Sequence, residues 1–148
     1  MRSALVLLGL FPALLLAQPR PKHVIVIGLD GFGGQAMKDA KAPNLRKLMA
    51  EGAWTLKARG VMPTVSSPNW ASMIMSAGPE QHGVLSNEWE PDKFEFTPTC
   101  QGMASTFPTI FGLLRQQRPK AHIAVIHDWQ GFGRLLEKAA PDHLRHVK

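Results

Sequence analysis

Three pieces of sequence between residues 23 and 70 decide the fold: HVIVIGLDGFGG at 23–34, APNLRKLMAEG at 42–52 and MPTVSSPNW at 62–70. The first piece is an unbroken apolar run that ends on Asp30, which is typical of a buried strand that delivers a carboxylate to the edge of a sheet. In the third piece, Ser66 and Ser67 precede Pro68, a residue favoured at the first position of a helix, where free N–H groups attract anions. An acid at a strand end and a hydroxyl at a helix start indicate a metal ion that activates a nucleophile.

The rest of the chain predicts an α/β fold with a mainly parallel sheet flanked by helices. Leu45, Leu48 and Met49 lie at helical spacing, so we expect a helix at 43–51 that ends at Gly52. The remaining expected elements are a helix at about 68–76, a long loop at 86–105, a helix capped by Ser105 or Thr106 and closed before Pro119, a strand at 121–126, and a helix over 129–148 interrupted near Pro141, with no further strand.

The first 17 residues read as a secretory signal peptide, because Arg2 precedes an apolar run from Ala4 to Leu16 and Ala17 supplies a small residue at a cleavage site. The run is shorter than the roughly 20 residues that a membrane span needs, although an uncleaved anchor is the alternative. We therefore expect one mature domain at 18–148, secreted or periplasmic, with no membrane contact after cleavage. An apolar content of 45% excludes a disordered chain.

Charge and cysteine usage exclude several classes of protein. The net charge of +6 comes from scattered Lys and Arg residues without a basic stripe, so we expect no nucleic-acid partner. A basic surface can still attract an anionic substrate. Cys100 is the only cysteine, so no internal disulfide can form, and nothing around it favours a reactive thiol. The sequence gives no indication of the oligomeric state.

Each candidate residue also has an ordinary structural interpretation. An aspartate after a strand can form a turn, and a serine before a helix can cap it. His143 and His146 lie three residues apart in the helix expected near the end of the chain, where they could bind a metal weakly, but solvent-exposed histidines are the simpler interpretation. The chemistry therefore depends on whether Asp30 and Ser66 meet.

The quoted pieces, with the continuation ASMIMSAGPEQHGV to Val84, resemble the start of the nucleotide pyrophosphatase/phosphodiesterase branch of the alkaline phosphatase superfamily. The resemblance covers residues 22–87 well and extends less clearly to residue 128. It implies that Asp30 binds one of two zinc ions, that Ser66 is the nucleophile and a zinc ligand, and that Asn69 holds a nonbridging phosphate oxygen. It further implies a covalent phospho-enzyme, a small-molecule phosphate ester or nucleotide as substrate, and a structural role for His82.

This sequence departs from the family in two ways. Ser67 stands where the family often has Phe, so Ser67, and more remotely Thr64, compete with Ser66 as the nucleophile. The other zinc ligands of the family, several Asp and His residues, come from a later part of the chain, so we expect residues 1–148 to be the N-terminal part of a longer enzyme with an incomplete fold, and little activity from this chain alone. An inactive fragment or a non-catalytic exported binding protein of the same fold is the alternative.

Two other enzyme classes do not fit the motifs. The glycines after residue 27 miss the G-x-G-x-x-G spacing of a dinucleotide site, and no P-loop occurs. A sulfatase-type nucleophile segment is also missing, because Cys100 is followed by Gln-Gly-Met.

Overall fold

The computed structural model describes residues 21–93, 95–103 and 105–148. The expected signal peptide at 1–17 lies outside these residues. The elements follow in the order 3-10 helix η1 (Ala36–Lys38), α1 (Pro43–Glu51), α2 (Ser66–Met75), α3 (Pro79–His82), α4 (Ile110–Gln117), β1 (Ala124–His127), α5 (Gln130–Arg134) and β2 (His143–His146). None of the helices in this described part is long and apolar enough to cross a bilayer.

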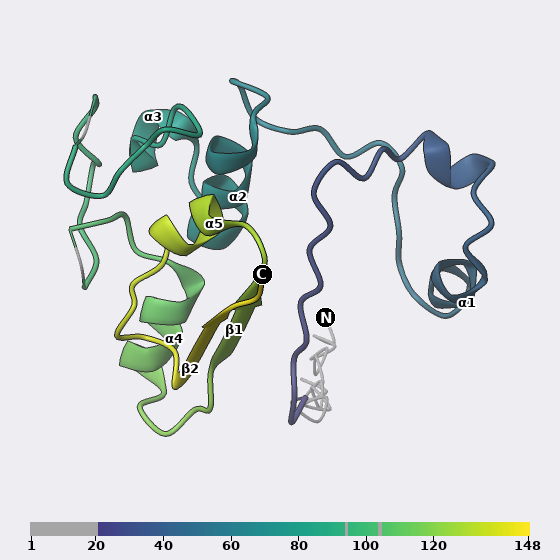
Figure 1. Ribbon diagram of the computed structural model, residues 1–148. Helices are drawn as coiled ribbons and strands as arrows, with labels where there is room; N and C mark the ends of the chain where they lie inside the picture. The colour runs from purple at the N-terminus through teal and green to yellow at the C-terminus, as the bar shows by residue number, and fades with distance from the viewer. Residues whose placement is uncertain (1–20, 94, 104) are drawn as a thin grey trace, which may run out of the picture.

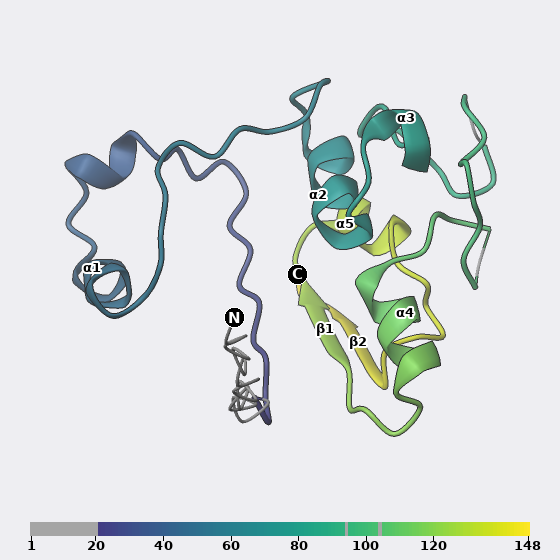
Figure 2. The ribbon, with the colours of Figure 1, turned by 180° about the vertical axis from the view of Figure 1, so that it is seen from behind.

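The fold is α/β, as the sequence predicts, with helices around a parallel sheet. Within the described part, the sheet has two strands, β1 and β2, which pair in parallel from Ala124 beside His143 to His127 beside His146. Figures 1 and 2 show helices α2 to α5 gathered with this sheet, whereas η1 and α1 lie apart from it at the end of two extended segments.

The main core lies between α2, α5 and the loop after α3. Its buried members are Ala71, Met75, Val84, Trp89 and Leu135. Four half-buried apolar side chains, Trp70, Ile74, Phe107 and Phe132, pack against this cluster. Because Ala71 and Met75 anchor α2 in the core, the first residues of this helix have a defined position at the edge of the core.

Several elements agree with the sequence predictions. Helix α1 has the predicted bounds, and Gly52 follows its last residue. Helix α2 starts at Ser66, two residues before the predicted start, so Pro68 occupies its third position. The predicted cap of α4 at Ser105 or Thr106 is wrong: the Thr109 hydroxyl accepts the N–H groups of Phe111 and Gly112.

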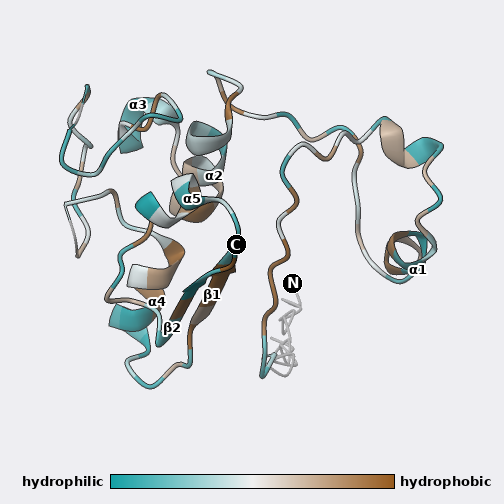
Figure 3. Cartoon of the chain, viewed as in Figure 1, coloured by the Kyte–Doolittle hydropathy of each residue, from teal (hydrophilic) through white to brown (hydrophobic). Residues whose placement is uncertain are grey.

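The strand predicted at residues 23–29 is wrong. These residues are extended but pair with no strand in the described part, and Val24, Ile25, Val26 and Ile27 are 76–86% exposed. Figure 3 shows the apolar colour along this segment, which runs apart from the sheet. An apolar pattern indicates the burial that a segment is suited to, but a strand also needs a neighbour to pair its backbone.

The helix predicted over 129–148 is also wrong. Only Gln130–Arg134 is helical, and residues 143–146 form the second strand. Asp142 explains the change, because its carboxylate accepts the Ile123 N–H at 2.7 Å and pairs with Arg115 at 2.9 Å. These contacts fix the start of β2 beside β1.

Candidate active site

Asp30 and Ser66 come together in the structure, as the site hypothesis requires. Asp30 lies in a turn where Gly31 has a φ of 66°, and the Gly31 N–H donates to Asp30 Oδ1 at 2.8 Å. The Ser66 hydroxyl lies close enough to the same carboxylate to lower its pKa. The indole N–H of Trp70, one turn further along α2, donates to Asp30 Oδ2 at 3.2 Å. The Asp30 carboxylate, at the end of the extended segment, is therefore in contact with side chains near the start of α2.

These contacts favour the ionised form of Asp30. The nearby Ser66 hydroxyl is the main reason that the pKa of Asp30 lies below its ordinary value; desolvation opposes the shift, and the Trp70 and Gly31 bonds add to it. An ionised carboxylate only accepts hydrogen bonds, so the Ser66 hydroxyl is the donor. Asp30 therefore orients the hydroxyl, and its lowered pKa makes it a weak base.

The environments of the two adjacent serines differ. Ser66 is half-buried at the first position of α2, whereas Ser67 is only 2% exposed. The Ser67 N–H donates to Asn87 Oδ1 at 2.8 Å. Thr64 is exposed and lies before the helix. Of the three hydroxyls considered, only that of Ser66 combines access with contact to Asp30.

The side chain of Asn69 holds the loop that leads into α2. Its Oδ1 accepts the Val61 N–H at 2.8 Å, and its Nδ2 donates to the carbonyls of Val65 at 2.8 Å, Pro63 at 3.3 Å and Val61 at 3.4 Å. The Met62–Pro63 peptide bond in this loop is cis. An amide that also bound a phosphate oxygen would have to leave some of these partners, so the phosphate role of Asn69 stays a prediction.

Asn87 is a site residue that the sequence does not reveal. Its side chain reaches the first turn of α2 from a position 20 residues beyond Ser67. Its oxygen accepts the Ser67 N–H, so the Asn87 amide, which also carries an NH₂ donor, lies against the residue that follows the candidate nucleophile. The only local signal is its place in the Ser-Asn-Glu loop after α3, and that sequence is not typical of any binding or catalytic site.

A Ser–His pair nearby looks catalytic but is structural. Ser72 Oγ lies 3.0 Å from His82 Nε2, and His82 Nδ1 accepts the Val84 N–H at 3.0 Å. Nδ1 therefore carries no proton, and Nε2 donates to Ser72, so it cannot take a proton from it. Burial lowers the pKa of His82 to about 4, outweighing an opposing effect of Glu80. His82 links α2 to α3, in agreement with its predicted structural role.

Comparison with known proteins identifies the family. The family model described as type I phosphodiesterase / nucleotide pyrophosphatase matches residues 24–145. This chain belongs to that family.

Two curated relatives align with part of the chain. Over 67 residues it is 27% identical to the human protein bis(5'-adenosyl)-triphosphatase ENPP4 and 25% identical to the bovine protein of the same name. The aligned stretch is 45% of this chain and 15% of the length of each relative. No solved structure matches the chain.

Asp30 and Ser66 have the chemistry of metal ligands, but a zinc site requires more than these two. A tetrahedral zinc site takes four ligands, and Asp30 with Ser66 offers two oxygen donors of suitable chemistry. In the residues that the structure describes, no three His, Cys, Asp or Glu side chains gather as a metal site would require. The pair fits one side of a metal site and cannot complete it alone.

The histidines near the end of the chain do not supply the remaining ligands. His143 and His146 lie on β2, where residues three apart point to opposite faces, so the predicted i, i+3 pair on a helix does not exist. His146 instead stacks on His127 with ring centroids 5.0 Å apart and planes 13° from parallel. In two nearly parallel, stacked rings, the nitrogen lone pairs lie in parallel planes and do not converge on one metal ion.

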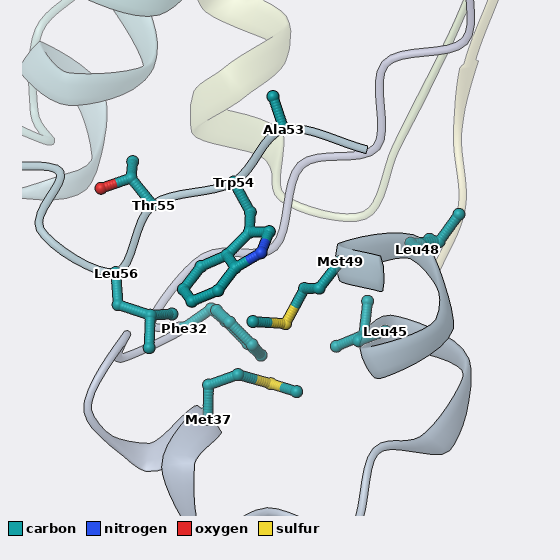
Figure 4. A pocket seen from close by; sticks show the side chains of 9 residues that line it. All are labelled: Phe32, Met37, Leu45, Leu48, Met49, Ala53, Trp54, Thr55 and Leu56. Atoms are coloured by element: carbon teal, nitrogen blue, oxygen red, sulfur yellow. The ribbon is translucent and has the colours of Figure 1, made fainter. Parts of the chain in front are cut away.

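A separate apolar pocket lies beside η1 and α1. Its volume is about 230 Å³. Figure 4 shows its lining, which consists of Phe32, Met37, Leu45, Leu48, Met49, Ala53, Trp54, Thr55 and Leu56. The lining has no titratable group, and the Thr55 hydroxyl accepts the Lys57 N–H. The pocket therefore offers no catalytic group, and the candidate chemistry stays at Asp30 and Ser66.

Proposed function

We propose that this protein hydrolyses phosphodiester or pyrophosphate bonds and that the Ser66 hydroxyl is the nucleophile. The observation that carries the proposal is the proximity of the Ser66 hydroxyl to the Asp30 carboxylate at the start of α2, in a chain of this family. The hydroxyl oxygen forms a bond to phosphorus while the bond to the leaving group breaks, and the leaving oxygen ends with a proton. The serine phosphoryl ester keeps the second substituent of the substrate, so water then breaks the bond between the serine oxygen and phosphorus and releases a phosphate monoester.

The residues around Ser66 have complementary roles in this proposal. Asp30 accepts the hydrogen bond that aims the hydroxyl, and the positive end of α2, a ten-residue helix, favours the phosphate charge. The Asn87 amide, held at the first turn of α2 by the Ser67 N–H, is a candidate donor to a nonbridging oxygen. Asn69 keeps the preceding loop in shape, and it is the second candidate for the phosphate contact.

Zinc belongs to the proposal as the group that makes the hydroxyl reactive. A zinc ion held by Asp30 and Ser66 would lower the pKa of the hydroxyl and offset the repulsion between Asp30 and an anionic substrate. Two donors are half of a tetrahedral set. We therefore propose that tight zinc binding needs further ligands beyond this pair, and that residues 1–148 by themselves have little activity. The weakness of a two-donor site supports this view.

The substrate class follows from the family description and from the names of the relatives. Phosphodiesters and nucleoside anhydrides share the phosphorus centre that Ser66 would attack. Two relatives are called bis(5'-adenosyl)-triphosphatases, so diadenosine triphosphate should be assayed beside bis(4-nitrophenyl) phosphate. We further propose export of the protein to a secreted or periplasmic location, on the signal-peptide pattern of residues 1–17.

The test uses the longest native form of the protein, both substrates, and zinc removed by a chelator and then restored. Ser66→Ala should lower kcat at least about 1,000-fold. Ser67→Ala is the matched control and should keep most activity, because its hydroxyl is buried away from Asp30. Asn87→Ala should cost about 100-fold, as expected for one lost oxyanion donor. Full zinc-dependent activity in Ser66→Ala would exclude the proposed nucleophile.

A non-catalytic role is the second candidate, and one observation favours it. The described residues bring no three His, Cys, Asp or Glu side chains together, and the two donors Asp30 and Ser66 alone bind zinc weakly. A longest native form without hydrolysis of either substrate, at any zinc concentration, would favour this alternative.

A further inference from the structure

Trp70 connects α2 to the carboxylate at the end of the extended segment. Its indole N–H donates to Asp30 Oδ2 at 3.2 Å across 40 residues of sequence. We propose that Trp70 is a positioning residue whose indole holds the Asp30 carboxylate in the orientation that the reaction requires. The inference rests on the proposed function of Asp30 and Ser66 and adds the residue that fixes their geometry.

The indole is held from two sides. On one side lies Gly28, where a Cβ atom would come within 2.3 Å of Trp70 Cη2 and 2.5 Å of Cζ3, so any larger residue would displace the ring. On the other side, Phe132 of α5 meets the indole edge to face, with ring centroids 5.3 Å apart and planes at 81°. This T-shaped arrangement is a favoured one for aromatic pairs. Phe132 therefore packs against the ring, and the lack of a side chain at Gly28 leaves room for it.

Asp30 needs such support because its own segment provides little. Residues 21–30 are exposed and pair with no strand in the described part. From its own segment, the Asp30 carboxylate receives the hydrogen bond of the adjacent Gly31 N–H. Trp70 is one turn from Ser66 on the same helix, so it fixes the carboxylate relative to the nucleophile's own helix. A packing role alone would require the ring but not the N–H. The hydrogen bond to Asp30 gives the indole a second role.

The contact can be tested in this chain without any activity measurement. The indole N–H resonances of uniformly ¹⁵N-labelled protein separate the tryptophans, and Trp70→Phe assigns the Trp70 signal. Asp30→Asn should shift that signal upfield, because a neutral acceptor binds the N–H more weakly than a carboxylate. Asp92→Asn, at an exposed loop position, should leave the signal in place. An unchanged Trp70 signal in Asp30→Asn would overturn the proposal.

The positioning role is tested by hydrolysis of bis(4-nitrophenyl) phosphate by the longest native form. Trp70→Phe keeps an aromatic ring and removes the donor, so kcat should fall about 10- to 100-fold with KM unchanged, when both forms are assayed well below their melting temperatures. Gly28→Ala should act in the same direction by moving the ring. Trp54→Phe is the control, since Trp54 lines the separate apolar pocket, and it should match wild type.

The outcomes separate the two proposals. Equal kcat for wild type and Trp70→Phe would overturn the positioning role even if hydrolysis depends fully on Ser66. An inactive wild-type protein would count against the proposed function, and the indole signal in Asp30→Asn would then decide alone whether Trp70 holds Asp30.

Discussion

Replacing Asn69 with Ala should loosen the loop that carries Ser66 into the site. The substitution removes two hydrogen bonds of 2.8 Å, from Val61 N–H to Oδ1 and from Nδ2 to the Val65 carbonyl, and two longer ones. At about 1 kcal/mol for each of the two short bonds, the free energy of unfolding should fall by about 2 kcal/mol. For a domain of this size the melting temperature should fall by about 4–8 °C.

Urea denaturation measures the global loss, and hydrogen exchange at the Val61 amide measures the local one. Asn69→Ala should abolish the protection of this amide, because its acceptor is gone. Asn44→Ala, at an exposed position of α1, is the matched control and should change stability by less than about 0.5 kcal/mol. Unchanged protection at Val61, with stability like that of the control, would refute the view that Asn69 holds this loop.

Two further predictions concern buried groups outside the site. Glu137 is 1% exposed and accepts the Thr109 hydroxyl and the N–H groups of Thr109, Gly112 and Met103. Glu137→Gln turns an NH₂ group toward these donors, so the free energy of unfolding measured in urea should fall by about 3 kcal/mol. The control Glu88→Gln, at an exposed position, should leave the free energy of unfolding almost unchanged. Burial lowers the pKa of His82 to about 4 from 6.5, so the unfolded chain binds its proton first as the pH falls. Stability should therefore decline by up to about 3 kcal/mol between pH 6.5 and pH 4, and His82→Gln should flatten that decline.

The sequence predicted elements whose signals are local. Helix α1 combines a proline at its first position, apolar residues at helical spacing and a glycine just beyond its end, so its bounds were predicted without tertiary information. The strand β1 follows from the apolar run before His127. The buried His82 was also predicted as structural, and its contacts to Ser72 and Val84 confirm this.

The errors arose where long-range contacts determine the structure. Residues 143–146 have a single apolar side chain and no strand pattern, yet the Asp142 contacts to Ile123 and Arg115 place them beside β1. The apolar run at 23–29 has a strong strand pattern but no pairing partner in the described part of the chain. In the candidate site, the meeting of Asp30 and Ser66 was predicted from the resemblance to the family, whereas Asn87 and the indole of Trp70 reach the site only through tertiary contacts.

The most direct test of the central claim is to identify the residue that carries the phosphoryl group. The longest native form is mixed with bis(4-nitrophenyl) phosphate and zinc, quenched in acid within one turnover, digested, and analysed by mass spectrometry. We predict a peptide that carries a 4-nitrophenyl phosphoryl group on Ser66, and no modified peptide in Ser66→Ala. The same group on Ser67 or Thr64, or full hydrolysis by Ser66→Ala, would contradict the assignment.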